Sequence, residues 1–262
     1  MPELTEAAAA IAREAAQKIM DVYVTDFEIR NKTDRSPLTM ADMASHDLIC
    51  AELARLTPDI PVLSEEAAHI PYSVRKSWDP YWLVDPLDGT REFIKRNGEF
   101  TVNIALIREN YPVLGVIYAP VKEVCYFAAK NEGAYKQATG AAGIRIKAKT
   151  SRADALVVAG SRSHGNERQQ EFFRNLGHNT KSIAIGSSLK FCLVAEGAAD
   201  IYTRFGPTSE WDTAAGQCIV EEAGGRVTDT GFNRLRYNAK DSLLNPDFVV
   251  YADPAFDWET RL

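Results

Sequence analysis

Apolar residues recur along the chain at two spacings, and each spacing predicts a type of secondary structure. Over Leu4–Val22 they lie three and four positions apart, which is typical of an amphipathic helix. A second helix is expected from an N-cap at Thr39 to about Leu56, because Asp42 stands three positions after the cap and Pro58 follows the end. These two helices precede the first expected strand.

Short apolar runs between residues 60 and 129 predict a series of strands. They are "IPVLSEE", "YWLVD", "FTVNIALI", "VLGVIYAP" and "EVCYFAAK". The second run is expected to end at Asp85, because Pro86 has no N–H group to donate to a sheet. Only short turns separate the later runs, so this part of the chain is expected to form a meandering sheet.

The second half of the chain alternates between strands and helices. Strands are expected at "ALVVAG", at 200–205 and near 247–252, and helices over 166–176, 187–197 and 211–225. The whole pattern predicts an α+β/α/β fold in which mixed or antiparallel sheets are layered with helices. We expect residues 1–145 to form a domain that carries the metal site, and residues 146–262 to form a second domain packed against it.

Composition narrows the classes of protein that fit. The 262 residues are 45% hydrophobic and 25% charged, enough for a substantial core, and the net charge of -6 argues against a binder of nucleic acid polymers. Glu3 and Glu6 stand where a signal peptide would be basic, and no apolar run is long enough for an integral membrane segment. A cytoplasmic protein is expected; the sequence leaves peripheral association with the inner membrane and the oligomeric state open.

The spacing of cysteine and histidine makes two kinds of site improbable. The four cysteines are far apart and form no CxxC pair, so we expect buried, reduced thiols. The four histidines form no HExxH motif, so no zinc site is expected. These residues are Cys50, Cys125, Cys192, Cys218, His46, His69, His164 and His178.

The segment "WLVDPLDGT" places two acids directly after an apolar strand. Gly89 permits a tight turn, and the N–H groups of Gly89 and Thr90 can point outward as an anion nest or a first helical turn. Asp85 and Asp88 beside such N–H groups suit a divalent cation, typically Mg²⁺, together with a phosphate. An Asx turn in "DPLDG" is an alternative explanation that needs no chemistry.

Further acids occur at the ends of other elements. Glu65 follows a short strand, Asp212 begins a helix, and Asp42 is the acid of the capping box. A solvated strand end, an N-cap and the capping box would explain them one by one. Four acids that converged without a cation would repel one another, however, which disfavours a purely structural role.

These segments, in this order, resemble the lithium-sensitive, Mg²⁺-dependent phosphatase superfamily that includes inositol monophosphatase. Its two signatures appear as "WLVDPLDGTREF" and "WDTAAG", with "SEE" upstream. The segments "SPLTMAD", "DGTREFIKRNGEFTVNIALI", "GSSLKFCLVAEG" and "RFGPTSEWDTAAG" are similar to the bacterial 3'(2'),5'-bisphosphate nucleotidases of sulfate assimilation, the CysQ type, which have Lys in place of Arg91. The resemblance implies a layered αβαβα sugar-phosphatase fold and inhibition by Li⁺.

The resemblance also implies a set of metal ligands. Two or three Mg²⁺ ions would be held by the carboxylates of Glu65, Asp85, Asp88 and Asp212 and by the backbone carbonyl of Leu87. Two metals about 4 Å apart can activate a water on one side of a phosphate and neutralise the leaving oxygen on the other.

Catalytic roles follow from the same resemblance. Gly89 and Thr90 would hold the scissile phosphate. Asp42 and the Thr90 hydroxyl would orient and deprotonate the attacking water, with Glu65 acting beside them.

A sequence difference from inositol monophosphatases and two further features favour a substrate that carries two phosphates. Inositol monophosphatases place a glutamate shortly before "WD", whereas this chain has Arg204, which can grip a second phosphate bidentately. Ser187 and Lys190 are expected as neighbours on a helix face and resemble a nucleotide-binding pair. His164, in the loop "SRSH", is a candidate contact for adenine. Each of these residues also has an ordinary structural explanation.

We therefore predict Mg²⁺-dependent hydrolysis of 3'-phosphoadenosine 5'-phosphate to AMP and phosphate. The same site would also remove the 3'-phosphate of 3'-phosphoadenylyl sulfate. The expected partner is thus a small nucleotide bisphosphate. An inositol monophosphatase or broad sugar phosphatase remains an alternative, as does a non-catalytic phosphate-binding regulator.

Overall fold

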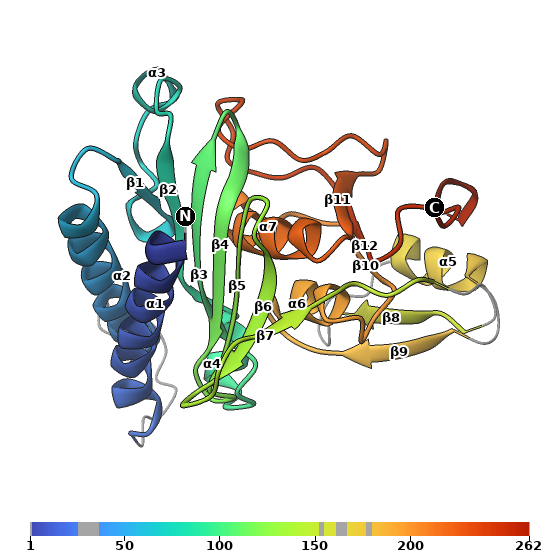
Figure 1. Cartoon of the computed structure of the whole chain (residues 1–262), viewed down its shortest axis with the longest axis horizontal. Helices are drawn as coiled ribbons and strands as arrows, with labels where there is room; N and C mark the ends of the chain where they lie inside the picture. Colours follow the sequence, from blue (N-terminus) through green and yellow to red (C-terminus); the bar gives the residue numbers. More distant parts are fainter. Residues whose placement is uncertain (1, 26–36, 152–154, 161–166, 177–179, 262) are drawn as a thin grey trace.

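Five layers of helices and sheets make up the molecule (Figure 1). Helices α1 (Pro2–Tyr23) and α2 (Pro37–Leu56) cover the outer face of a seven-stranded sheet, and α5 (Glu167–Asn175) covers the outer face of a five-stranded sheet. Helices α6 (Leu189–Ala195) and α7 (Ala214–Glu222) lie between the sheets. The expected αβαβα layering is confirmed. The computed structural model describes residues 2–25, 37–151, 155–160, 167–176 and 180–261.

The seven-stranded sheet is the meander that the apolar runs predict. Its strands lie in chain order from β1 to β7; β1 and β2 are parallel and every later pair is antiparallel. They are β1 (Val62–Ser64), β2 (Tyr81–Asp88), β3 (Thr101–Arg108), β4 (Tyr111–Ala119), β5 (Val124–Ala129), β6 (Gly133–Ala138) and β7 (Ile144–Ile146).

The two faces of this sheet bury different cores, because side chains alternate along each strand. On β2, Trp82 and Val84 face α1 and α2, whereas Tyr81 and Leu83 face the layer of α6 and α7. The indole N–H of Trp82 donates to the Thr57 hydroxyl at 2.9 Å, which satisfies the one polar atom of this buried ring. Burial on both faces explains why "YWLV" contains no charged residue.

The five-stranded sheet mixes parallel and antiparallel pairs. Its order is β11-β12-β10-β8-β9, with β8 parallel to both β10 and β9, and β12 antiparallel to both β10 and β11. The strands are β8 (Val157–Gly160), β9 (Lys181–Ala184), β10 (Ile201–Arg204), β11 (Arg226–Asp229) and β12 (Phe248–Tyr251). The first sheet ends at Ile146, before this one begins; the division into domains 1–145 and 146–262 stays a prediction.

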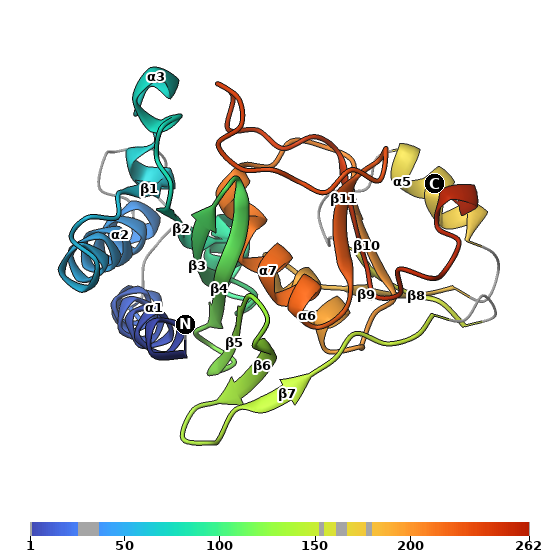
Figure 2. The ribbon, with the colours of Figure 1, turned by 45° about the horizontal axis from the view of Figure 1, so that its top comes forward.

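Small residues let the central helices fit between the sheets (Figure 2). A Cβ atom on Gly115 of β4 would lie 2.5 Å from the carbonyl oxygen of Ala215 in α7, and a Cβ atom on Gly216 would lie 2.4 Å from the ring of Phe191 in α6. Both contacts are far shorter than normal van der Waals separations. Gly115 on β4 and Gly216 of "WDTAAG" therefore set how closely α7 approaches its neighbours on the two sides.

Two expected boundaries are wrong. Strand β2 continues through Pro86 to Asp88, and its register against β3 shifts between Asp85 and Asp88. The irregular register interrupts the ladder at Pro86, so the missing N–H costs no sheet hydrogen bond. Helix α2 begins at Pro37, so Thr39 lies inside its first turn and is not the N-cap.

Short helices complete the described chain. They are η1 (Glu65–Ala67), α3 (Tyr72–Arg75), α4 (Thr90–Ile94), η2 (Glu210–Asp212) and η3 (Glu259–Arg261). Among the helices that the structure describes, none has the length and apolar character needed to cross a membrane. All four cysteines are free thiols, as expected, and Cys50 alone is partly exposed.

Candidate active site

Five acids converge where β1 and β2 end. Ser64 of β1 pairs with Val84 of β2, so the next residues along these parallel strands, Glu65 and Asp85, lie side by side. Asp88 ends β2, Asp42 comes from α2, and Asp212 comes from η2 in the second half of the chain. We call Asp42, Glu65, Asp85, Asp88 and Asp212 the acid cluster.

Burial and mutual repulsion make the charged form of every member unfavourable. Burial, followed by the charges of Glu66 and Glu65, raises the pKa of Asp42 to about 8. Burial is also the main cause that raises the pKa of Glu65 and of Asp212 to about 7. The pKa values of Asp85 and Asp88 rise for the same reason, Asp85 well above its ordinary range. Such raised values are typical of a functional site.

These acids are held by one another and by the main chain. Glu65 shares a hydrogen bond with Asp85, and Asp42 shares one with Glu66, while Asp42 Oδ1 is buried without a partner among the described residues. Within those residues, no three His, Cys, Asp or Glu side chains are already arranged to hold a metal ion. A cation would therefore have to draw the carboxylates together. Their hard oxygen donors suit Mg²⁺.

A cavity of about 260 Å³ opens beside the acid cluster. Seven of the predicted site residues line it, whereas Asp42, Glu65, Asp85 and Leu87 do not. Glu65 and Asp85 nevertheless interact electrostatically with Asp88, and Asp42 interacts with Asp85. His164 lies outside the described residues. The predicted residues that line the cavity are Asp88, Gly89, Thr90, Ser187, Lys190, Arg204 and Asp212.

Gly89 makes the close approach at the base of this cavity possible. Its φ angle is +91°, and a Cβ atom there would lie 3.1 Å from the carbonyl oxygen of Glu99 and 3.2 Å from Cβ of Ser187. Both the left-handed backbone and the lack of space call for glycine. Thr90 follows as the first residue of α4, so the expectation of a first helical turn at this position is confirmed.

Asp212 is held by a capping box rather than acting as an N-cap. The N–H group of Ser209 donates to Asp212 Oδ2 at 2.8 Å, and Ser209 itself is the cap of η2. The expected single helix over 211–225 is interrupted at Thr213, where η2 gives way to α7. The interruption leaves Asp212 at the cavity wall instead of inside a continuous helix.

Ser187 and Lys190 line the cavity, but they do not share a helix face. Ser187 lies before α6 with a φ of +49°, and Lys190 is in the first turn of α6. The buried Lys190 ammonium donates to the carbonyl oxygen of Ser187 at 2.5 Å and lies 5.3 Å from the centre of the Tyr202 ring. Burial lowers its pKa to about 8, against the opposing influence of Asp88.

Arg204 ends β10 and lines the same cavity as Asp88 and Asp212. Its Nη2 donates to the carbonyl oxygen of Pro207 at 3.2 Å, and its Nε has no partner among the described residues. The guanidinium therefore has hydrogen-bonding capacity that the described residues leave unused.

Several residues at this site were not identified from the sequence. Glu66 bonds to Asp42, and Ser188 contacts Asp88 together with the polar residues Thr101 and Asn103. Thr101 and Asn103 carry a signal in hindsight: they are polar, two positions apart, and lie on one face of an otherwise apolar strand. Ser188 has no comparable signal, because it lies in the second half of the chain and its contacts are with distant residues of the first sheet.

Comparison with known proteins gives consistent results. Residues 1–253 match the model of the inositol monophosphatase family. A 3'(2'),5'-bisphosphate nucleotidase CysQ of Salmonella typhimurium is 53% identical over 243 residues, which cover 92% of this chain and 96% of that protein. The protein of the same name from Escherichia coli K12 is 51% identical with the same coverage.

Solved structures have the same architecture. CysQ from Bacteroides thetaiotaomicron, described as a bacterial member of the inositol monophosphatase family, has a TM-score of 0.87 and 45% identity, covering 95% of this chain and 97% of that one. An inositol monophosphatase from Zymomonas mobilis has a TM-score of 0.80 at 24% identity, covering 97% and 94%; this second likeness concerns the fold alone.

Proposed function

The chain belongs to the inositol monophosphatase family, and we propose that it is a Mg²⁺-dependent 3'(2'),5'-bisphosphate nucleotidase that hydrolyses 3'-phosphoadenosine 5'-phosphate to AMP and phosphate. The observation that carries the choice of substrate is the position of Arg204, which shares one cavity with Asp88 and Asp212. A cation beside the acids suits a substrate with a second phosphate, whereas an inositol monophosphate has none. We place the reaction in the cytoplasm, in keeping with the free thiols.

The acid cluster fits the divalent metal that this activity needs. Its donors are all carboxylate oxygens, the charged forms are unfavourable without a cation, and Asp42 Oδ1 is buried and unpartnered among the described residues. We assign two or three Mg²⁺ ions to Glu65, Asp85, Asp88, Asp212 and the carbonyl oxygen of Leu87. Bound Mg²⁺ would supply positive charge that activates a water and neutralises the leaving oxygen.

The remaining steps are assigned to side chains around that centre. The Thr90 hydroxyl and Asp42 would orient the attacking water, and Asp42, as a carboxylate, would accept its proton. The left-handed turn at Gly89 brings the main chain to the cavity surface, where the N–H groups of Gly89 and Thr90 would hold the scissile phosphate.

Two cationic side chains, Lys190 and Arg204, would bind the other end of the substrate. Lys190 has three N–H groups and uses at most two of them on the loop carbonyls of Ser187 and Ile185, so one remains for a phosphate or ribose oxygen. Arg204 would grip the second phosphate through its guanidinium. Ser187, at the turn that packs against Gly89, would contact the part of the nucleotide between its two phosphates.

A direct test compares phosphate release from 3'-phosphoadenosine 5'-phosphate, inositol 1-phosphate and fructose 1,6-bisphosphate, each with Mg²⁺ and with EDTA. We expect 3'-phosphoadenosine 5'-phosphate to have the highest kcat/KM by at least about tenfold, and no turnover of any substrate in EDTA. Equal or better turnover of inositol 1-phosphate would overturn the choice of substrate. Full activity after exhaustive chelation would overturn the metal-dependent reaction itself.

The role of Arg204 has its own test. Truncation of one partner of a desolvated charge pair costs about 2–5 kcal/mol, so Arg204→Ala should lower kcat/KM for 3'-phosphoadenosine 5'-phosphate by at least about 30-fold. Arg204→Lys keeps the charge but loses the bidentate geometry, so its kcat/KM for this substrate should lie between those of the wild type and Arg204→Ala. Turnover of inositol 1-phosphate is the control and should change little. An equal loss on both substrates would mean that Arg204 supports the structure of the site.

A further inference from the structure

The loop between β9 and α6 is fastened to the first sheet through its own main chain. The N–H group of Gly186 donates to Glu99 Oε2 at 2.8 Å, and the N–H group of Ser188 donates to Asp88 Oδ2 at 2.5 Å. Residues 186–188 also line the cavity. We call residues 185–188 the pocket loop; it comes from the second half of the chain and binds acids of the first.

The Ser188 side chain adds a second attachment at the same point. Its hydroxyl is buried, donates to Asn103 Oδ1 at 2.8 Å and lies 2.8 Å from the hydroxyl of Thr101. Thr101 and Asn103 are the β3 partners of Asp88 and Asp85 in the sheet register. One residue of the pocket loop is therefore bound both to Asp88 and to the strand that pairs with the acid-bearing strand.

This arrangement fixes where the Asp88 carboxylate points. The N–H group of Ser188 approaches one carboxylate oxygen closely, and hydrogen bonds that involve a charged group are the stronger kind. Outer partners of this kind orient metal ligands and tune their affinity.

The hydroxyl of Ser188 is committed to the protein rather than to a substrate. A hydroxyl has one proton to donate and lone pairs to accept, and Asn103 takes the proton. The Thr101 hydroxyl lies closer to Ser188, at 2.8 Å, than to Asp88 Oδ2, at 3.4 Å, so its proton is best placed on Ser188. The side chain thus acts on the site through its neighbours.

We propose that Ser188 is a positioning residue for Asp88, through which the pocket loop of the second half completes the metal site of the first. The proposal rests on the proposed function, because it takes Asp88 as a metal ligand. Without the hydroxyl anchor the loop loosens, the Ser188 N–H group loses its fixed position, and the carboxylate is free to turn away from the cation.

The test measures metal binding directly, with Mn²⁺ as a paramagnetic substitute for Mg²⁺. Free Mn²⁺ is titrated by electron paramagnetic resonance against the wild type, Ser188→Ala and Ser151→Ala. Changes to outer partners of metal ligands cost about 10–100-fold in affinity, so Ser188→Ala should weaken Mn²⁺ binding by at least about tenfold. Ser151→Ala is the matched control and should bind as the wild type does, because its buried hydroxyl has no partner among the described residues.

A second readout separates positioning from direct contact with substrate. Loss of activity in Ser188→Ala should be recovered when Mg²⁺ is raised to saturation, because the defect lies in metal affinity. A raised KM that persists at saturating Mg²⁺ would instead mean that Ser188 binds the substrate, and would overturn the proposal. Mn²⁺ affinity within about twofold of wild type would overturn it as well.

Folding and the proposed function are controlled separately. The melting temperature in EDTA reports whether Ser188→Ala folds; if it does not, Ser188→Cys retains a weak donor of similar size and should show an intermediate loss of Mn²⁺ affinity, while wild-type affinity in that variant contradicts the proposal. A wild type that binds no Mn²⁺ would defeat the proposed function itself. A wild type that binds Mn²⁺ no better than Ser188→Ala would defeat only the role of Ser188.

Discussion

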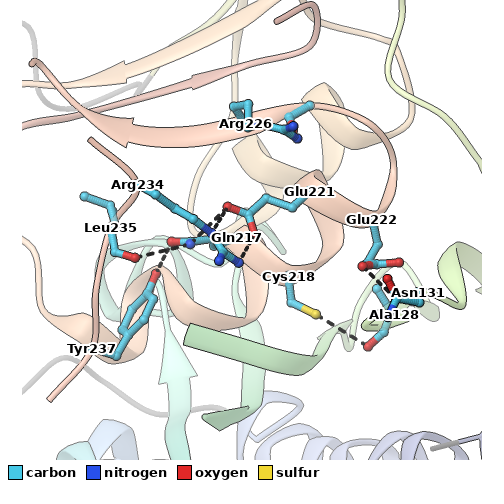
Figure 3. Close-up of polar contacts among 11 residues, drawn as sticks. Ala128, Asn131, Gln217, Cys218, Glu221, Glu222, Arg226, Arg234, Leu235 and Tyr237 are labelled. Atoms are coloured by element: carbon cyan, nitrogen blue, oxygen red, sulfur yellow. Dashed lines mark hydrogen bonds and ion pairs between the residues drawn. The ribbon is translucent and has the colours of Figure 1, made fainter. Parts of the chain in front are cut away.

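The acid cluster and the polar residues at the other end of α7 satisfy their polar groups in opposite ways. At the far end, Arg234 donates to both carboxylate oxygens of Glu221 at 2.8 and 2.5 Å (Figure 3). Gln217 donates to Glu221 at 3.1 Å, and the buried Tyr237 hydroxyl donates to Gln217 Oε1 at 2.8 Å. We call Gln217, Glu221, Arg234 and Tyr237 the α7 network. Here the carboxylate of Glu221 is paired with Arg234, and both the NH₂ group and the oxygen of the Gln217 side chain are hydrogen-bonded.

The comparison teaches which buried polar groups serve stability and which serve chemistry. In the α7 network each group meets a partner of the same chain, so the fold is complete without a ligand. In the acid cluster, Asp42 and Glu65 are bonded to other acids, burial and neighbouring charges raise their pKa values, and Asp42 Oδ1 has no partner in the described chain. We propose that a bound cation completes that region. The two regions should therefore respond to substitution with opposite signs.

The largest expected effect is on turnover, in the acid cluster. Asp88→Asn removes a charge from a proposed metal ligand, and a metal ion contributes several kcal/mol to the transition state, so kcat should fall by at least about 10³-fold. The melting temperature in EDTA should stay level or rise, because one of several repelling carboxylates is gone. Steady-state kinetics measure the loss of kcat, and thermal melting in EDTA measures the change in stability. Unchanged turnover would mean that Asp88 is a turn residue.

The next effect is on the pH dependence of stability without metal. The pKa is raised to about 8 for Asp42 and to about 7 for Glu65 and Asp212. An acid with a higher pKa folded than unfolded binds more protons when folded, so the free energy of unfolding falls as the pH rises from about 4 to about 8. We expect the melting temperature in EDTA to drop by about 10 °C over this range.

Excess Mg²⁺ should remove most of that drop, because the cation stabilises the charged carboxylates. Melting curves at about pH 5 and about pH 8, with EDTA or Mg²⁺, provide the measurement. If the pH dependence is the same in both, the cluster does not bind the cation.

A smaller effect is expected in the α7 network. Tyr237→Phe leaves the buried carbonyl of Gln217 without its donor, which costs about 1–3 kcal/mol of the free energy of unfolding. Turnover and Mg²⁺ dependence should remain near wild type. Urea denaturation measures the loss, and Tyr135→Phe, whose exposed hydroxyl makes one long bond, is the matched control with no measurable loss. A tenfold fall in kcat would show that the network reaches the chemistry.

The smallest effect is expected at the edge of the same network. Glu221→Gln loses an ion pair with a partly exposed arginine, so the free energy of unfolding should fall by only about 0.2–1 kcal/mol. This substitution changes a carboxylate to an amide, as Asp88→Asn does, but it should lower stability and spare turnover. Stabilisation by Glu221→Gln would erase the contrast between the two regions.

Local pattern was enough to predict most of the fold. The spacing of apolar residues predicts α1, and the short runs predict the meander, because these elements depend on neighbours in the chain. The acids of the site were found from motifs that lie at strand and helix ends. The structure brings Asp42, Glu65, Asp85, Asp88 and Asp212 together as expected, and their role as ligands stays a prediction.

The missed features depend on contacts between distant segments. Pro86 remains in a strand because the sheet register is irregular there, and no propensity reveals that. Ser187 leaves the predicted helix because its turn packs against Gly89, about a hundred residues away in the chain. The bond from Ser188 to Asp88 likewise exists only after the two sheets have stacked around α7.

The small residues around α7 bear on how sequence signatures are read. A Cβ atom on Gly115 would meet the carbonyl oxygen of Ala215 in α7, and a Cβ atom on Gly216 would meet the ring of Phe191, so neither glycine has room for a side chain. Gly216 of the "WDTAAG" signature thus helps to set the thickness of the sandwich, and only Asp212 is assigned to chemistry. A homologue that kept the small residues and lost the acids should still fold into these layers while catalysing nothing. A search that weighs all signature positions equally would count it as an enzyme, so the acids need to be assessed separately from the small residues.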